Sequence, residues 1–316
     1  MTVRLFVNFC PVRGRLRSNL RRTSMESCGF LLVNKPKGMT SFFLVRSFRK
    51  LLNMRRIGYA GTLDPLASGL MIMAVGEATK LLHFLEQTEK KYEVEIRFGS
   101  VSETYDAEGP FHEVATAKPV LRDQIVQVLE RDFLGERQQV PPKYSAVKIQ
   151  GKHAYDLVRG GKDVQLKART VTFYDVDVDA FEYPLLRCTV HCSAGTYIRS
   201  FAHDLGQILG CGAYVSDLKR VDVGEYSLQN AVDFSSLTPE TIHGFLVPPE
   251  KFLSHWPGCE LTDEEYAFLQ HGGFVKNRWN VSEPQILALF QGHTVGLLET
   301  CEGGGMIKFA KKFNFD

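Results

Sequence analysis

The sequence predicts an α+β fold built around a mostly antiparallel mixed sheet, followed by a small C-terminal β-barrel. Two observations support this prediction. Single strands and single helices follow one another in irregular order, as in α+β proteins. The length of 316 residues exceeds what one hydrophobic core usually supports, so we expect a large domain with a smaller attachment. Hydrophobic residues make up 44% of the chain, and no apolar stretch approaches the roughly 20 residues that span a bilayer.

The clearest strand lies at residues 91–98, where apolar and charged side chains alternate. Tyr92, Val94, Ile96 and Phe98 share one face, and charged residues occupy the other. A turn at Pro36 and Gly38, followed by Thr40 or Ser41 as a cap, precedes residues with helical spacing. We therefore expect further strands at 30–33, 170–178 and 185–193, and helices at 42–52, 76–87, 120–133 and 198–209.

The main domain ends at about residue 247, where the run VPPEKF at 247–252 is interpreted as a linker. Thr262 and Glu265 form a capping-box pattern that opens a helix over residues 263–270. Short strands at 286–290, 294–298 and 306–309 then favour a small barrel. The predicted units are a basic extension at 1–24, a main domain at 25–247 and a C-terminal domain at 248–316.

The first 24 residues carry six arginines and no acid. Such a segment resembles an organelle-targeting peptide, but a disordered arm, or an upstream start codon with Met25 as the working start, fits equally well and is favoured. The remainder of the chain has 32 basic and 36 acidic residues. A polyanionic ligand must therefore be held by local basic patches and not by the overall charge.

The seven cysteines are odd in number and show no C-x-x-C spacing, which favours a reduced, cytoplasmic setting. Cys188 and Cys192 alternate with Leu186 and Val190 along one strand face, so we interpret both as core residues. Nothing in the sequence indicates a metal, nucleotide or flavin site, and no metal or other cofactor is expected.

The densest group of special residues is GYAGTLDPLASG, at residues 58–69. Glycines allow close backbone approach, and Pro65 fixes the backbone after Asp64, so a loop would present this carboxylate rigidly. An isolated Asp-Pro pair is far more often an ordinary turn. The glycines do not form a phosphate loop either, because no G-K-S/T follows them.

Four separate segments outweigh the ordinary-turn interpretation. They occur in the order VNKPKGMTS at 33–41, GYAGTLDPLASGL at 58–70 with GEATK at 76–80, KKYEVEIRFG at 90–99, and SAGTYIRS at 193–200 followed by LGCGAYVSDLKR at 209–220. Together they resemble the TruB-type tRNA pseudouridine-55 synthases, from about residue 30 to residue 223. The resemblance implies a pseudouridine synthase catalytic domain and, for residues 248–316, a PUA-like barrel.

By this resemblance Asp64 is the catalytic aspartate that initiates cleavage of the bond between uracil and C1′ of ribose. A carboxylate suits this step because the ribose develops positive character as the bond breaks. Attack on C1′ and a glycal route both remain open. Arg199, in GTYIRS, corresponds to the arginine that pairs with this aspartate, although an arginine at a helix start is usually solvated.

The resemblance also implies several base-binding residues. Tyr92 corresponds to the tyrosine that stacks on the target base, and Leu218 to the leucine that packs on the opposite side. Tyr197 matches a further site tyrosine, although both tyrosines also fit a strand core. Tyr59 stands where the family usually has histidine, and it could stack near the extruded nucleotide. Lys35, in the first segment, is a candidate substrate contact.

Residues 141–169, hereafter the thumb segment, carry seven Lys or Arg and only two acids, with aromatic residues between them. This composition suits phosphates beside unstacked bases, and the alternative is a solvated basic face. The segment also resembles the family's thumb-like insertion, which implies that Lys143, Lys148 and Lys152 contact the T arm. Residues 248–316 have six basic and nine acidic residues, which argues against strong phosphate binding there.

We therefore predict a stand-alone, cofactor-free tRNA pseudouridine synthase that extrudes uridine 55 of the T loop and rebonds C1′ to C5. The resemblance implies a monomer with tRNA as partner and no membrane. Alternatives are an RNA-binding, tRNA-folding chaperone of the same fold and a guide-dependent relative, which the absence of a basic C-terminal tail disfavours. A glycoside hydrolase would need a second catalytic carboxylate, and the sequence offers no convincing candidate.

Overall fold

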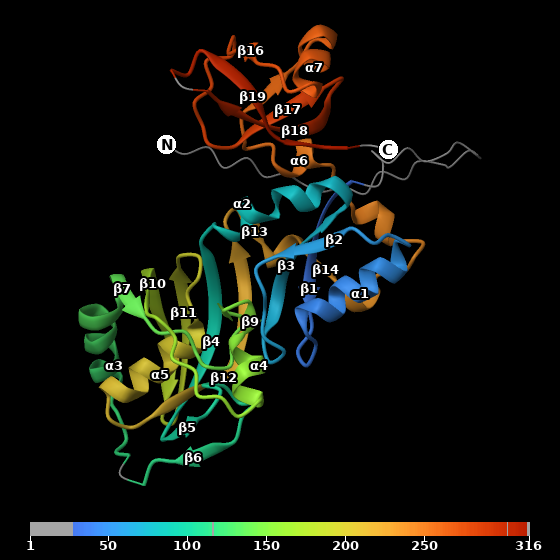
Figure 1. Cartoon of the computed structure of the whole chain (residues 1–316). Helices are drawn as coiled ribbons and strands as arrows, with labels where there is room; N and C mark the ends of the chain where they lie inside the picture. Colours follow the sequence, from blue (N-terminus) through green and yellow to red (C-terminus); the bar gives the residue numbers. More distant parts are fainter. Residues whose placement is uncertain (1–27, 116, 302, 315–316) are drawn as a thin grey trace.

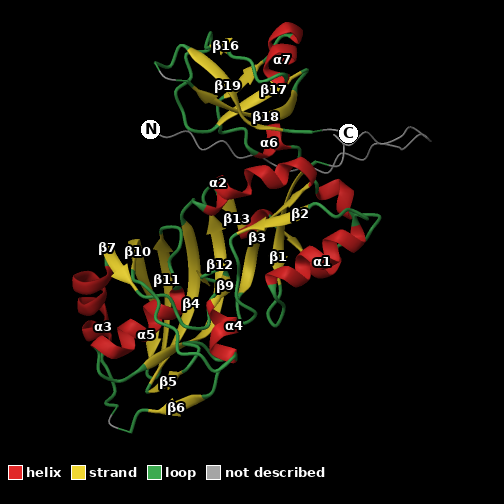
Figure 2. Cartoon of the chain, in the orientation of Figure 1, coloured by secondary structure: helices red, strands yellow, loops and turns green. Residues whose placement is uncertain are grey.

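The computed structural model describes residues 28–115, 117–301 and 303–314, so the predicted basic extension at 1–24 lies outside the described residues. The described chain forms a ten-stranded sheet, a five-stranded sheet and two small two-stranded ribbons. Figure 1 shows the five-stranded sheet at one end of the molecule, beyond α2, and Figure 2 shows helices lying across the larger sheet. The predicted α+β class is confirmed.

The larger sheet has the strand order β14-β1-β3-β12-β4-β11-β10-β7, with β2 beside β3 and β13 beside β12. Its pairs are antiparallel except β1 with β14 and β12 with β3. Its strands are β1 (Gly29–Lys35), β2 (Ile57–Ala60), β3 (Ser68–Val75), β4 (Lys90–Phe98), β7 (Gly135–Gln139), β10 (Arg169–Glu182), β11 (Leu185–Cys192), β12 (Ala213–Val223), β13 (Tyr226–Ser227) and β14 (Val232–Asp233). The predicted mixed, mostly antiparallel sheet is present.

Alternating burial follows β4 as the sequence predicts. Tyr92, Val94, Ile96 and Phe98 are buried, whereas Glu93 and the other charged positions on the opposite face are more accessible. Because β4 pairs with β11 on one side and β12 on the other, it lies inside the sheet. The apolar face of β4 is therefore part of the main hydrophobic core.

The helices are α1 (Ser41–Leu51), α2 (Leu82–Glu86), α3 (Arg122–Val128), α4 (Ala154–Arg159), α5 (Ile198–Ile208), α6 (Pro249–Phe252) and α7 (Asp263–Gln270). Thr40, and not Ser41, caps α1, because its hydroxyl accepts a hydrogen bond from Phe43 N at 3.1 Å. The apolar faces of α1, α3 and α5 pack on the same core as β4. The ribbons are β5 (Ser100–Ser102) with β6 (Phe111–Glu113) and β8 (Lys148–Ile149) with β9 (Lys152–His153).

The smaller sheet is a curled half-barrel with the order β15-β17-β18-β19-β16. Its strands are β15 (Gly258–Glu260), β16 (Val275–Lys276), β17 (Ile286–Phe290), β18 (His293–Thr300) and β19 (Met306–Lys312). The predicted capping box before α7 is present: Glu265 N donates to Thr262 Oγ1 at 3.2 Å, and Thr262 N donates to Glu265 Oε2 at 2.9 Å. Packing of Leu287, Leu297 and Phe313 with residues of β1 and β3 joins the two sheets.

The interpretation of residues 247–252 as a linker is wrong. Val247 exchanges two backbone hydrogen bonds of 2.8 Å with Phe30, and residues 249–252 form α6. Phe252 is buried and stacks on Phe30 with ring centroids 4.5 Å apart. The segment is therefore a packed connection, because an apolar side chain that follows the two prolines is buried in the core.

Other differences concern element type and strand number. The predicted helix at 76–87 is a 3₁₀ turn (Gly76–Leu81) followed by α2, and the one at 120–133 ends in a π-helical turn (Leu129–Phe133). Strand β3 was not predicted because seven of its eight residues are buried, so it shows no alternation.

Among the described residues, no helix is long and apolar enough to cross a membrane.

Candidate active site

Asp64 lies in the turn between β2 and β3, and two hydrogen-bonded contacts attach this turn to the start of α1. Ser41 Oγ donates to Leu63 O at 2.8 Å and accepts from Leu63 N at 2.9 Å. Gly38 N donates to Pro65 O at 2.8 Å. The backbone on both sides of Asp64 is therefore held by the segment 38–41, and the carboxylate is presented from a braced turn, as the sequence predicts.

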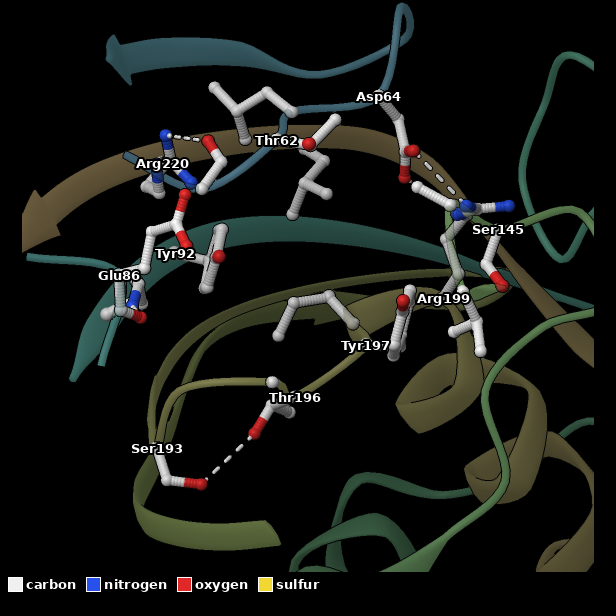
Figure 3. Close-up of a pocket in the computed structure, with 18 of the residues that line it drawn as sticks. Thr62, Asp64, Glu86, Tyr92, Ser145, Ser193, Thr196, Tyr197, Arg199 and Arg220 are labelled. Atoms are coloured by element: carbon white, nitrogen blue, oxygen red, sulfur yellow. Dashed lines mark hydrogen bonds and ion pairs between the residues drawn. The ribbon is translucent and has the colours of Figure 1, made fainter. Parts of the chain in front are cut away.

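Arg199 pairs with Asp64. Its Nε lies 2.8 Å from Asp64 Oδ2, and its Nη2 donates to Asp64 Oδ1 at 3.2 Å. The arginine is the second residue of α5, and its side chain is 5% exposed, whereas that of Asp64 is 34% exposed. The alternative of a solvated arginine is thus excluded, and Arg199 supports the carboxylate from the interior (Figure 3).

A second carboxylate, which the sequence analysis missed, contacts the same guanidinium. Asp106 is buried, and its Oδ2 lies 3.4 Å from Arg199 Nη1. Thr104 holds both groups, because its carbonyl accepts from Arg199 Nη1 at 2.8 Å and its hydroxyl donates to Asp106 Oδ1 at 2.5 Å. Tyr144 O accepts from Arg199 Nη2 at 3.0 Å. Arg199 is therefore fixed from three segments that are distant in sequence.

A cavity of about 400 Å³ opens beside Asp64. Its lining includes five residues singled out from the sequence, namely Asp64, Tyr92, Tyr197, Arg199 and Leu218. Figure 3 shows Asp64, Tyr92, Tyr197 and Arg199 converging from the Asp64 turn, β4 and the start of α5. Leu218 lies on β12. Cavities of this size accept small organic ligands, so one nucleotide is a suitable occupant. Asp106 does not line it, so it adds no second carboxylate to the cavity wall.

Tyr92 is the third residue of β4 and lies directly opposite Arg220 of β12. The tyrosine is 8% exposed, and the positive charge of the Arg220 guanidinium acts on its phenol. Burial raises the pKa of Tyr92 to about 12, although the guanidinium opposes this rise. The phenol is therefore neutral at physiological pH and can present both a ring face and a hydroxyl group to a base.

Arg220 is a functional candidate that the sequence analysis overlooked, although it lies in the LGCGAYVSDLKR segment. Its side chain is fully buried, and Nε donates to Leu70 O at 2.8 Å and Nη2 to Gly61 O at 3.2 Å. A Cβ at Gly69, where φ is +106°, would lie 2.3 Å from Arg220 O. The alternation along β12 could have identified Arg220, because it follows Leu218 by two residues and therefore lies on the same buried face.

Tyr197 caps α5 and is held through its backbone. Gln139, which is buried, accepts from Tyr197 N at 2.8 Å and donates to Tyr197 O at 3.0 Å. The guanidinium of Arg169 lies 5.0 Å from the centre of the tyrosine ring. The half-buried ring thus belongs to the cavity wall and not to the core, which decides between the two interpretations of the sequence.

The cavity wall carries more positive than negative charge. Its ionisable residues other than tyrosine are the cations Lys90, Arg169, Arg199 and Arg220 and the acids Asp64 and Glu86. Burial lowers the pKa of Lys90 to about 8, and its ammonium donates to Glu86 O at 2.5 Å. Such a wall suits a ligand with a phosphate group.

Two predicted contacts lie elsewhere. Lys35 is fully buried and donates to Pro36 O at 3.0 Å and to Met39 O at 2.7 Å, so it stabilises the turn before α1 and the expectation of a substrate contact is corrected. Tyr59 is half-buried and packs against the main core, outside the cavity lining.

The thumb segment folds over the cavity. Ser145, Ala146 and Val147 line it, and the β8–β9 ribbon and α4 follow. Lys148 and Lys152 are exposed on the ribbon, and Lys143 is exposed and pairs with Asp163 at 2.8 Å. None of these three lysines lines the cavity, so any RNA contact they make lies outside it.

No cluster of His, Cys, Asp or Glu that could hold a metal occurs among the described residues.

Residues 49–198 match the family model of the TruB family pseudouridylate synthase N-terminal domain. Residues 199–246 match that of the tRNA pseudouridylate synthase B C-terminal domain. The chain is 35% identical over 250 residues to a tRNA pseudouridine synthase B of Clostridium tetani, which covers 79% of this chain and 86% of that protein. It is 39% identical over 268 residues to the protein of the same name from Pseudomonas aeruginosa, covering 82% and 87%.

The fold is also similar to solved structures. A Cbf5–Nop10–Gar1 complex contains a chain that superposes with a TM-score of 0.68 at 24% identity, covering 92% of this chain and 85% of that chain. An H/ACA ribonucleoprotein bound to a substrate RNA containing 2′-deoxyuridine gives the same TM-score at 23% identity, covering 92% and 86%. At this level of identity the likeness establishes the fold and nothing further.

Proposed function

This chain belongs to the TruB family of pseudouridylate synthases, and from that premise we propose that it isomerises uridine to pseudouridine in tRNA. The relatives named tRNA pseudouridine synthase B support tRNA as the substrate. The motif resemblance supports the finer assignment to uridine 55 of the T loop. The observation that carries the proposal is the Asp64–Arg199 pair at the wall of a nucleotide-sized cavity that also contains Tyr92 and Leu218.

In this proposal the target uridine leaves its stack and enters the cavity. Extrusion costs a few kcal/mol of stacking, which contacts with the protein must offset. Tyr92 and Leu218 pack against the uracil, and the cationic wall holds the adjacent phosphate. Asp64, aimed by Arg199, initiates breakage of the bond between C1′ and N1. The uracil turns while it stays bound, C1′ bonds to C5, and the proton displaced from C5 is balanced by one gained at N1.

Substrate and product of this reaction are isomers, so it needs no oxidant, reductant or group donor. We accordingly propose that the chain acts without a cofactor and without a guide RNA, as a monomer. Free, mostly buried cysteines support the cytoplasm as its location, since reduced thiols are typical there. The exposed lysines of the thumb segment and the PUA-like half-barrel at 248–316 are the proposed additional contacts with the tRNA.

The test uses the purified full chain and an unmodified tRNA transcript, without guide RNA or cofactor. Pseudouridine is mapped by carbodiimide treatment and primer extension, with Asp64→Asn in parallel. We expect a stop at the T-loop uridine with the unaltered chain and none with Asp64→Asn. Binding of tRNA without any stop from either protein would instead favour the chaperone or the guided alternative, and release of free uracil would indicate hydrolysis.

A further inference from the structure

A strongly basic stretch precedes Asp64 in the chain. Residues 35–63 contain seven Lys or Arg and no acid. Three of the seven are buried or paired: Lys35 is buried, Lys37 pairs with Asp217 at 2.6 Å, and Arg56 pairs with Glu77. The remaining four are exposed and have no carboxylate partner among the described residues: Arg46, Arg49, Lys50 and Arg55.

Three of these four cations share the exposed side of α1. Arg46, Arg49 and Lys50 are spaced three and four residues apart, so their like charges repel across neighbouring turns. No acidic residue occurs in α1 or in its first turn to offset this repulsion. A polyanion bound at this surface would remove the repulsion, whereas an ordinary solvated helix face usually mixes both signs of charge.

Two large aromatic side chains stand in the first turn of the same helix. Phe42 is 57% exposed and Phe43 is 45% exposed. Phe43 meets Phe234 only edge to face, with ring centroids 6.4 Å apart, so much of its ring stays accessible. Exposed rings beside cations form the combination that holds unstacked bases and phosphates of single-stranded RNA.

This surface is directly connected to the catalytic turn. Ser41, the residue before Phe42, exchanges two hydrogen bonds with the backbone of Leu63, which precedes Asp64. In Figure 1, α1 and α4 of the thumb segment appear on opposite sides of the turn between β2 and β3. A nucleic acid that enters the cavity beside Asp64 therefore passes close to the start of α1.

We propose that the exposed surface of α1 and the turn after it, formed by Phe42, Phe43, Arg46, Arg49, Lys50 and Arg55, is a second RNA-binding surface. It holds nucleotides that flank the extruded uridine. The proposal rests on the proposed function, since it takes tRNA as the ligand. A lipid surface is the less suitable occupant, because the apolar face of α1 with Leu44, Val45 and Phe48 is already buried in the core and cannot insert into a membrane.

The test compares two triple variants that remove the same charge. Arg46→Gln/Arg49→Gln/Lys50→Gln alters the proposed surface. Lys118→Gln/Arg122→Gln/Arg131→Gln alters exposed cations around α3, which lies at the other end of the sheet. Binding of an unmodified tRNA transcript is measured over a range of salt concentrations. Each lost phosphate contact should reduce the slope of log K against log salt by about one.

We expect the α1 variant to bind at least about 10-fold more weakly at low salt, with a slope smaller by about two to three, and the α3 variant to bind normally. Phe42→Ala should weaken binding by about 5-fold or more through lost stacking, whereas Phe111→Ala, at an equally exposed ring, should not. At subsaturating tRNA the α1 variant should form pseudouridine more slowly than the α3 variant. Circular dichroism checks that both triple variants are folded.

Equal affinities and slopes for the two triple variants would overturn the inference while pseudouridine formation by the unaltered chain still upheld the proposed function. Conversely, the α1 variant could have an altered slope while the unaltered chain forms no pseudouridine. The proposed function would then be wrong, and the surface of α1 would still bind RNA. Binding to vesicles of phosphatidylglycerol that is lost in the α1 variant, with tRNA binding unchanged, would assign the surface to lipid and also overturn the inference.

Discussion

Arg199 contacts Asp64 side by side, with Nε 2.8 Å from Oδ2 and Nη2 3.2 Å from Oδ1. Two parallel contacts fix the plane of the carboxylate as well as its position. Because Arg199 is buried and Asp64 is partly exposed, the arginine supports the carboxylate from behind and leaves it facing the cavity. The orientation of Asp64 therefore depends on a planar guanidinium and not on positive charge alone.

Arg199→Lys should accordingly lower kcat by at least about 100-fold, since an ammonium cannot make the paired contact and a small misplacement of a reacting group has an effect of this size. Arg137→Lys is the matched control, because Arg137 pairs with Asp204 of α5 at 3.6 Å outside the cavity. Pseudouridine formation is measured at saturating tRNA. Similar rates for Arg199→Lys and the control would contradict an orienting role for the guanidinium.

Asp106→Asn tests the second carboxylate. The amide can keep one hydrogen bond to the segment 104–108 but loses the charge beside Arg199 Nη1. We expect kcat to fall about 10-fold, which corresponds to roughly 1.4 kcal/mol, with little change in KM, because Asp106 does not line the cavity. Asp204→Asn should leave both constants unaltered. A raised KM with normal kcat would show that Asp106 acts on binding instead.

Sequence motifs identified those cavity residues whose own turn, strand or helix start places them in the cavity lining. Asp64, Tyr92, Tyr197, Arg199 and Leu218 meet this condition, and they line one cavity. Asp106 could not be found, because its contact with Arg199 joins residues 93 positions apart in the chain and no local pattern marks it. Lys35 shows the opposite error. It belongs to a motif, but its side chain is buried and stabilises the turn before α1.

The fold was predictable where burial is one-sided. Strand β4 alternates because only one face packs on the core, whereas β3 is buried on both faces and its apolar run could equally have been a buried helix. The connection at 247–252 was misread because prolines indicate a linker in sequence, while the packing of Phe252 on Phe30 is a tertiary contact. The local sequence pattern therefore located segments of regular structure. Contacts between residues distant in the chain decided whether a segment became a helix, a strand or a packed connection.

Gly69→Ala should destabilise the protein by about 3 kcal/mol or more, because φ is +106° and the added Cβ would lie 2.3 Å from Arg220 O. Gly38→Ala isolates the backbone contribution: φ there is +77° with nothing within 4 Å of the added atom, so we expect a loss of about 1 to 2 kcal/mol. Urea unfolding of both variants measures the free energies. Equal losses would show that close approach to β12 contributes nothing.

Lys90 should make stability depend on pH. Burial lowers its pKa from 10.5 to about 8 in the folded protein, so between these values the unfolded chain binds more protons and rising pH favours the folded state. Buried cysteines with raised pKa values act in the opposite direction, so the comparison must be a difference. We expect the free energy of unfolding of the unaltered chain, minus that of Lys90→Met, to increase from pH 7 to pH 10 in urea titrations. A difference that stays constant would mean that the folded protein does not lower the pKa of this ammonium group, and the cationic wall beside Glu86 would then keep its full charge across that range.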